Sequence, residues 1–155
     1  MVDGNLGRLA RWLRFLGYPT APVRGGNDAQ MLECLAKTKP GLFLTRDRDL
    51  ARRAKQAGHP TLLLNAARLP GQFMRLRKQL SFVPAHVLSL CALCNVPLEP
   101  APAPAPVHVP AALAASARYC PACGRYYWMG SQAQRIVRGL RTYLRGRVPQ
   151  GTRGD

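Results

Sequence analysis

The feature that most constrains this chain is a pair of CxxC motifs, Cys91/Cys94 and Cys120/Cys123. Each motif places two thiols on one tight turn, and two such turns can surround a single tetrahedral metal ion. A Pro/Ala-rich stretch, 97–110, separates the motifs and is expected to form an extended loop between the turns. The spacing predicts a structural zinc site, because four sulfur ligands leave no open position for a substrate. Two disulfides, or four unrelated buried thiols, are the alternatives.

The charge balance indicates a polyanionic partner. The 155 residues contain 23 Lys and Arg against 7 Asp and Glu, a formal net charge of +16. This excess favours nucleic acid, and the alternative is a basic surface that is merely solvated. We expect no membrane partner, because the sequence has no run of 18 apolar residues and no polybasic anchor. No small-molecule substrate is expected either.

The cysteines and the first residues predict a cytoplasmic location. Residues 1–10 contain no apolar stretch of the kind found in a secretory signal. A reducing, intracellular environment would keep the four thiols free for zinc.

Residues 1–85 alternate short apolar runs with amphipathic segments. In the first amphipathic segment leucines recur at helical spacing from Leu6 to Leu16, between Asn5 as N-cap and Gly17 as stop signal. The patterns predict strands at 1–3, 20–23, 42–45 and 61–64, and helices at 6–16, 27–37, 48–57 and 71–80. Strands that alternate with helices imply an α/β fold, with a parallel sheet covered by helices on both faces.

The remaining residues predict a small second unit. Residues 86–145 are expected to form a zinc ribbon, with strands near 86–90 and 126–128, closed by a basic amphipathic helix at 132–144. The last stretch, 146–155, has the composition of a disordered tail.

The few acidic residues are concentrated near the N-terminus. Asp3 and Asp47 each follow a predicted strand, and Asp28 opens an intervening helix. The carboxyl ends of parallel strands meet at one edge of the sheet, where such folds bind ligands. Carboxylates gathered there repel one another unless a cation joins them, and Mg²⁺ or Mn²⁺ prefers oxygen ligands. On a basic protein, this pattern favours metal-dependent phosphodiester hydrolysis.

Each acid also has a simpler explanation. Asp28 and Asp47 are placed to stabilise helix N-termini. Asp49 is a first-turn acid that the helix dipole favours, and Asp3 could be an exposed loop residue.

Five motifs together resemble the C-terminal RNase domain of Mut-seven-type proteins, a PIN-like nuclease domain with an attached zinc ribbon. The resemblance covers about residues 2–140. Its motifs are VDGNLGRLARWLRFLGY (2–18), NDAQML (27–32), LTRDRDL (44–50), CALCN (91–95) and CPACGRYYWMGS (120–131).

The resemblance implies a Rossmann-type sheet with an acidic, divalent-metal active site. By similarity, Asp3, Asp28 and Asp47 are the metal-binding acids, Asp49 is an auxiliary acid, and the four cysteines bind zinc. The chain departs from the family pattern at Pro19, where the family usually has an acid, and at Gln132, where it usually has a histidine. Only two residues precede Asp3, so we expect a truncated first strand.

Arginines near the acidic edge are the predicted contacts to the nucleic-acid backbone, although solvated surface arginines are the alternative. Three lie on the first predicted helix, and two flank Asp47. They are Arg8, Arg11, Arg14, Arg46 and Arg48.

The predicted function is a ribonuclease that uses Mg²⁺ or Mn²⁺ at its acidic residues. The alternative is a non-catalytic module that binds RNA or a ribonucleoprotein, which the departure at Pro19 and the short first strand favour. A DNA-directed nuclease is a third interpretation, because RNA is chosen over DNA through the resemblance alone.

Overall fold

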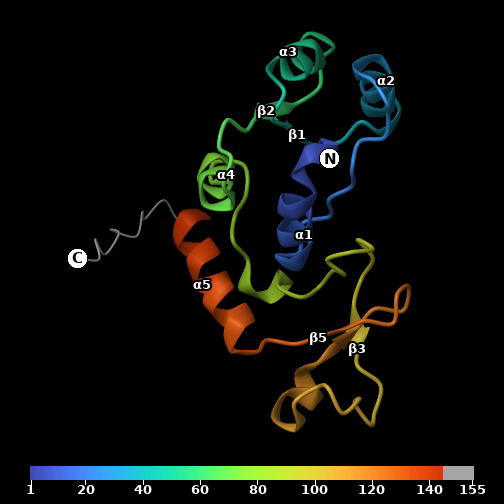
Figure 1. Cartoon of the computed structure of the whole chain (residues 1–155), viewed down its shortest axis with the longest axis vertical. Helices are drawn as coiled ribbons and strands as arrows, with labels where there is room; N and C mark the ends of the chain where they lie inside the picture. Colours follow the sequence, from blue (N-terminus) through green and yellow to red (C-terminus); the bar gives the residue numbers. More distant parts are fainter. Residues whose placement is uncertain (145–155) are drawn as a thin grey trace, which may run out of the picture.

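The structure is a computed structural model that describes residues 1–144 (Figure 1). The chain forms an α/β unit, followed by a small antiparallel unit and a C-terminal helix. Its elements are η1 (Gly4–Leu6), α1 (Gly7–Phe15), α2 (Asp28–Thr38), β1 (Phe43–Thr45), α3 (Arg48–Gln56), β2 (Thr61–Leu63), α4 (Leu69–Leu76), η2 (Pro84–His86), β3 (Glu99–Pro100), η3 (Ala111–Ser116), β4 (Arg118–Tyr119), β5 (Tyr126–Tyr127) and α5 (Ser131–Leu144). The predicted disordered tail, 146–155, lies outside the described residues.

The sheet is parallel and its strands are short. β1 pairs with β2 in parallel, and Val2 bridges Leu44 of β1 on one side and Pro22 on the other. The order across the sheet is therefore Pro22, Val2, β1, β2. The chain runs outward from Val2 to Pro22 and then returns to the other side of Val2, which creates a topological switch point between Val2 and β1.

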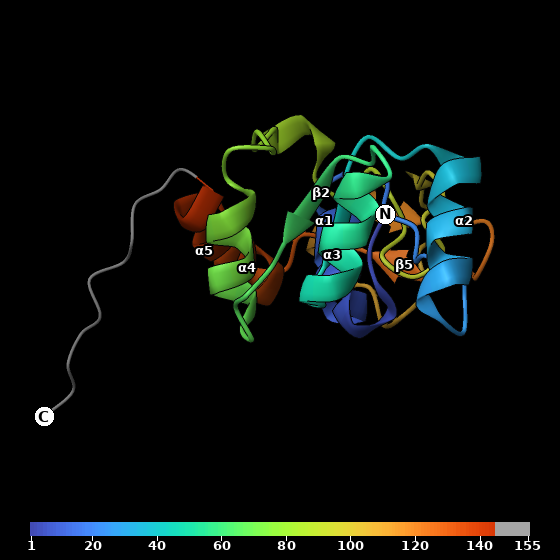
Figure 2. The same ribbon diagram turned by 90° about the horizontal axis from the view of Figure 1, so that it is seen from above.

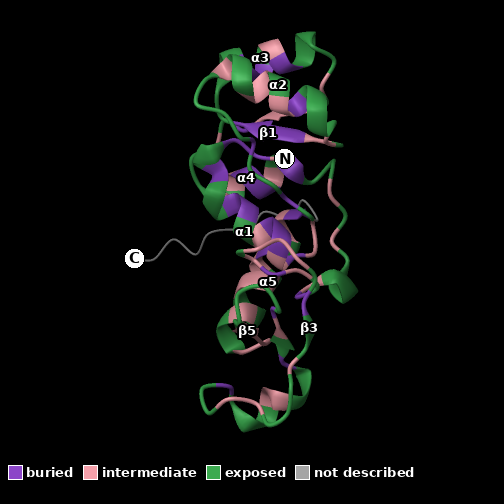
Figure 3. Ribbon diagram, turned by 90° about the vertical axis from the view of Figure 1, so that its right-hand side faces the viewer, coloured by how far each residue is buried: buried purple, intermediate pink, exposed green. Residues whose placement is uncertain are grey.

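Helices cover both faces of this sheet (Figures 1 and 2). On one face α1 and α4 pack against Val2 and Leu44, in a core that includes Phe73 and the leucines of α1. On the other face α2 and α3 enclose Phe43 and Leu35. The buried residues concentrate around β1, α1 and α4 (Figure 3). The predicted α/β class and parallel sheet are confirmed, with strands shorter than expected.

The start of the first helix differs from the prediction. Asp3, and not Asn5, caps the helical segment: its side chain accepts a hydrogen bond from the amide of Asn5 at the start of η1, and the N-cap of α1 itself is Leu6, without a side-chain cap. A 3₁₀ turn therefore precedes α1. Gly17 ends the helical segment as predicted, with a φ of 88° that disfavours other residues.

The predicted strand at 86–90 is wrong. Pro84–His86 forms η2, and Leu88 has a φ of 60°, which is incompatible with an extended strand. The amide of Leu88 donates to the carbonyl of Phe15 at 2.9 Å, so this part of the segment lies against the end of α1. Only Leu90 pairs within the ribbon, in an isolated antiparallel bridge to Pro97. The ribbon sheet consists of β3, β4 and β5 in antiparallel order.

The last helix packs on the α/β unit. Its sequence pattern predicted an amphipathic helix, and α5 begins one residue before the expected range. Leu140 and Leu144 are buried in the same core as α1 and α4. The prediction grouped this helix with the ribbon, whereas its apolar face closes the core of the first unit. Within residues 1–144, no helix has the length and apolar character needed to cross a membrane.

Candidate functional site: a cysteine cluster and an acidic edge

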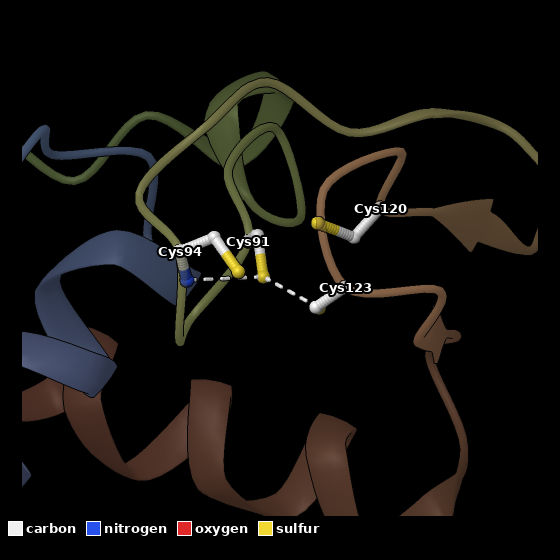
Figure 4. A group of neighbouring side chains, drawn as sticks. All are labelled: Cys91, Cys94, Cys120 and Cys123. Atoms are coloured by element: carbon white, nitrogen blue, oxygen red, sulfur yellow. Dashed lines mark hydrogen bonds between the residues drawn. The ribbon is translucent and has the colours of Figure 1, made fainter.

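The two CxxC turns converge in the structure (Figure 4). The Sγ atoms of Cys91, Cys94, Cys120 and Cys123 all lie within 4.8 Å of one another, and none is in a disulfide. The Sγ atoms of Cys91 and Cys123 are 3.8 Å apart. A zinc ion about 2.3 Å from each sulfur of a tetrahedron requires sulfur atoms about 3.8 Å apart. The cluster could therefore hold a zinc ion, and the disulfide alternative is wrong for these four residues.

The surroundings of Cys91 favour a thiolate. Burial of the sulfur opposes ionisation, but the Tyr127 hydroxyl lies 3.2 Å from it and the amide of Cys94 donates to it at 3.3 Å. These hydrogen bonds lower the pKa of the Cys91 thiol to about 6. Hydrogen bonding to Cys123 raises the pKa of Cys94, and burial raises the pKa of Cys120. A cation bound to all four sulfurs would displace the remaining protons and favour the thiolate forms, and zinc would supply that charge.

Arg14 joins the first cysteine turn to the α/β unit. It is only 9% exposed, and its guanidinium donates to the carbonyls of Thr20, Ala92 and Leu93 at 2.7, 3.0 and 2.9 Å. Its pKa is lowered by burial. The prediction that Arg14 contacts nucleic acid is wrong, because its donors are engaged by backbone carbonyls inside the protein.

A second contact supports the same junction. The side-chain oxygen of Asn95, the residue after Cys94, accepts from the amide of Thr20 at 2.9 Å. Asn95 has a φ of 62°, so the turn doubles back toward the α/β unit at this point. The cysteine turn is therefore held by side chains from both units.

Asp3 and Asp47 lie at the carboxyl ends of neighbouring strands, on either side of the topological switch point. Asp3 is 5% exposed, and its Oδ2 accepts a hydrogen bond from the Thr45 hydroxyl at 2.9 Å. The same hydroxyl accepts from the amide of Asp47 at 3.0 Å. Asp47 is exposed and caps α3, with Oδ1 accepting from the amide of Leu50 at 2.9 Å. Thr45 thus connects the two acids across the strand ends.

The other two predicted acids are engaged elsewhere. Asp28, at the start of α2, forms an ion pair of 2.8 Å with Arg53 of α3. Asp49 is exposed and lies 3.5 Å from Arg52. Within residues 1–144, only the four cysteines form a group of three or more such side chains with ligand atoms within 4.8 Å. The structure therefore brings Asp3 and Asp47 to one edge but does not gather three carboxylates at metal-binding distance.

The acidic residues divide into those that form an ion pair and those that do not. Among the described residues, the ion pairs join Glu33 to Lys37 and the two pairs named above. Neither Asp3 nor Asp47 takes part in one. A buried carboxylate without a cationic partner is costly unless hydrogen bonds or a metal ion compensate it.

Most of the predicted arginines are exposed, and two of them line a groove. Arg8, Arg11, Arg46 and Arg48 all have exposed side chains. Arg8 and Arg46 lie on a groove of about 410 Å³ beside η1. Sequence analysis missed a third arginine there, Arg68, at the end of the loop that follows β2. The rule that identified Asp3 and Asp47 could have found it, because that loop also follows the carboxyl end of a parallel strand.

The fold and the site define an α/β protein with a small parallel sheet, acidic side chains at its switch point and an attached four-cysteine cluster that could hold zinc. The family model of the Mut7-C RNAse domain matches residues 1–140, and the chain belongs to this family. Membership indicates a ribonuclease-related function, with RNA as substrate or partner. Neither the curated proteins nor the solved structures gave a match to this chain.

Proposed function

We propose that the protein is a metal-dependent ribonuclease whose active site lies at the carboxyl edge of the parallel sheet. The observation that carries this proposal is the buried, unpaired carboxylate of Asp3 beside Asp47, at the switch point of a sheet in an RNAse-family chain. Open α/β sheets bind their ligands at this position. The family's PIN-like architecture is part of the same proposal.

The two carboxylates keep ligand capacity for Mg²⁺ or Mn²⁺. Asp47 uses one oxygen to cap α3. Asp3 accepts from Thr45 through Oδ2 and, at 3.5 Å, from the Asn5 amide through Oδ1, so each carboxylate still retains free lone pairs. Oxygen donors of this kind suit these hard cations. When bound, such an ion would supply an activated water and neutralise charge on the scissile phosphate.

The side chains around the acids would orient them. The Thr45 hydroxyl fixes the Asp3 carboxylate, and the cap of α3 fixes Asp47. Asp28 pairs with Arg53 through one oxygen and would bring the other to the ion, and Asp49 would be an auxiliary acid. Exposed Arg8, Arg11, Arg46 and Arg48 would bind phosphates of the RNA backbone.

The test is cleavage of labelled RNA with Mn²⁺, with Mg²⁺ and with EDTA. Asp47→Asn is the most informative variant, because asparagine is also a good N-cap and α3 should be preserved while the charge is lost. Glu33→Gln is the matched control, since Glu33 is exposed and pairs only with Lys37 among the described residues. Metal-dependent cleavage that is lost in Asp47→Asn and kept in Glu33→Gln is expected. Absence of cleavage in every metal would refute the enzyme.

A non-catalytic RNA-binding module is the second candidate, and the ion pair between Asp28 and Arg53 favours it. A pure binder would retain RNA affinity in Asp47→Asn and would cleave nothing. A ribonucleoprotein partner belongs to this alternative. In both cases we propose that zinc in the cysteine cluster is structural, because its four ligands are all protein sulfurs.

A further inference from the structure

We propose that Arg8, Arg46 and Arg68 form a phosphate-binding groove that takes a single-stranded segment of RNA beside the acidic edge. The inference deepens the proposed function and rests on it for the identity of the polyanion. Arg68 is the new residue, and no motif or family correspondence had assigned it a role.

The groove combines three positive charges with no compensating acid. Its lining contains Arg8, Arg46 and Arg68 and no carboxylate. Among the described residues, none of these guanidinium groups takes part in an ion pair. The first turn of α4, which begins at the groove, also contains no acidic residue. Three like charges around one hollow repel each other, and a bound anion removes that cost.

The groove lies next to the acids because residues of its lining are close to Asp3 and Asp47 in the sequence. Asn5, in the turn that follows Asp3, lies on its wall, and Arg46 directly precedes Asp47. The loop that carries Arg68 follows β2, so all three segments lie at the carboxyl edge of the sheet. A phosphate held by these arginines would therefore place a neighbouring phosphodiester near Asp3 and Asp47.

The loop that presents Arg68 is fixed by packing. The Gln72 side chain is buried and donates to the carbonyl of Ala66 at 3.1 Å, which ties the loop to the first turn of α4. A Cβ on Gly71 would lie 2.6 Å from the Cβ of Ala66, so only glycine allows this close approach. Arg68 thus projects from a preformed loop, which lowers the ordering cost of binding.

The shape of the groove favours a single strand. The three arginines line one hollow of about 410 Å³ between η1, the start of α1 and the loop before α4. A single strand can lower one phosphate into such a hollow. A duplex presents its phosphates on a broad outer surface and would contact only the rim.

The experiment measures RNA affinity and not cleavage, so that its failure is distinct from failure of the nuclease. Single-stranded RNA and a duplex of the same sequence are titrated with the zinc-loaded full chain, without added Mg²⁺ or Mn²⁺, at several salt concentrations, using fluorescence anisotropy. The variants are Arg68→Ala and, as the matched control, Arg118→Ala. Arg118 is an exposed arginine on β4 of the ribbon, so both variants lose the same charge.

For a single strand, each phosphate contact lowers the slope of log affinity against log salt by about 0.7. Arg68→Ala should reduce the magnitude of that slope by about this amount and weaken binding, while Arg118→Ala leaves the slope unchanged. Equal effects of the two variants would overturn the groove, and so would an effect of Arg68→Ala that is as large on the duplex. If Arg68→Ala weakens RNA binding as expected, but the unsubstituted protein cleaves no RNA with any metal, the nuclease proposal is refuted and the groove is retained.

Discussion

Replacing Arg14 by methionine should destabilise the protein strongly, because this buried side chain links α1 to the first cysteine turn. Three backbone carbonyls, those of Thr20, Ala92 and Leu93, accept hydrogen bonds from its guanidinium. Methionine preserves the unbranched stem and the helix propensity, so the substitution removes the donors and the charge with little other change.

The magnitude follows from the loss of these hydrogen bonds. A hydrogen bond that involves a charged group contributes about 1.5–3 kcal/mol, but the contributions do not add. Two of the three bonds are only partly buried, and water can reach those carbonyls after the substitution. We therefore expect a loss of about 3 kcal/mol in the free energy of unfolding. For a chain of this size, the midpoint should fall by about 6 to 12 °C.

The assay is thermal unfolding of zinc-loaded protein, with Arg11→Met as the matched control. Arg11 is exposed and lies on the same helix, so its replacement should change stability by less than about 0.5 kcal/mol. After zinc is removed with a chelator, the gap between the two variants should narrow, because the turn that holds Ala92 and Leu93 loses its constraint. Equal midpoints for the two zinc-loaded variants would refute the assignment of Arg14 as the link.

Three further changes test other parts of the molecule. Asp28→Asn and Arg53→Gln should show a coupling of about 0.5–1 kcal/mol in a double-mutant cycle of unfolding, because their ion pair is half exposed; additive effects would mean that the pair contributes nothing. Gly71→Ala should lower both stability and RNA affinity, because its Cβ would lie 2.6 Å from the Cβ of Ala66. Adding Ala66→Gly to the same chain should restore both, and a failure to restore them would show that this Cβ contact is not the cause. Cys123→Ser should reduce zinc content in a colorimetric assay of purified protein, and unchanged zinc would remove this residue from the ligand set.

The elements with strong local signals could be predicted from the sequence. The leucine spacing of α1 and the Asn27 cap of α2 are local features, and the structure reproduces both, with Asn27 accepting from the amide of Gln30. The alternation of strands and helices predicted a parallel sheet because crossover connections allow few other arrangements. The convergence of the two CxxC turns was also predictable, since their geometry suits one metal ion.

The errors come from contacts between residues far apart in the sequence. The segment 86–90 has the composition of a strand, but a hydrogen bond from Leu88 to Phe15 holds it against the end of α1. Arg14 belongs to a regular basic stripe, and only the folded position of Ala92 and Leu93 shows that it is buried. The sequence likewise could not show that Asp28 is engaged in an ion pair, because its partner Arg53 is 25 positions away. Sequence periodicity predicts on which face of its helix a residue lies. It does not predict which other segment packs against that face, because tertiary packing determines this contact.

The two parts of the candidate site lie at opposite ends of α1. Its first turns follow Asp3 and line the arginine groove, whereas its last turn carries Arg14, which binds the cysteine turn. A helix of nine residues spans about 13.5 Å, so a zinc ion in the cluster would lie too far away to act on a phosphodiester at the acidic edge. A zinc ion in the cluster would instead fix the carbonyls that Arg14 requires, and thereby the C-terminal end of the helix. Because α1 is buried along Leu9 and Leu13 in the main core, its N-terminal end is positioned independently of zinc. Under the proposed function, the cysteine cluster would therefore support the stability of the fold, and cleavage at the carboxyl edge would depend on Asp3, Asp47 and the groove beside them.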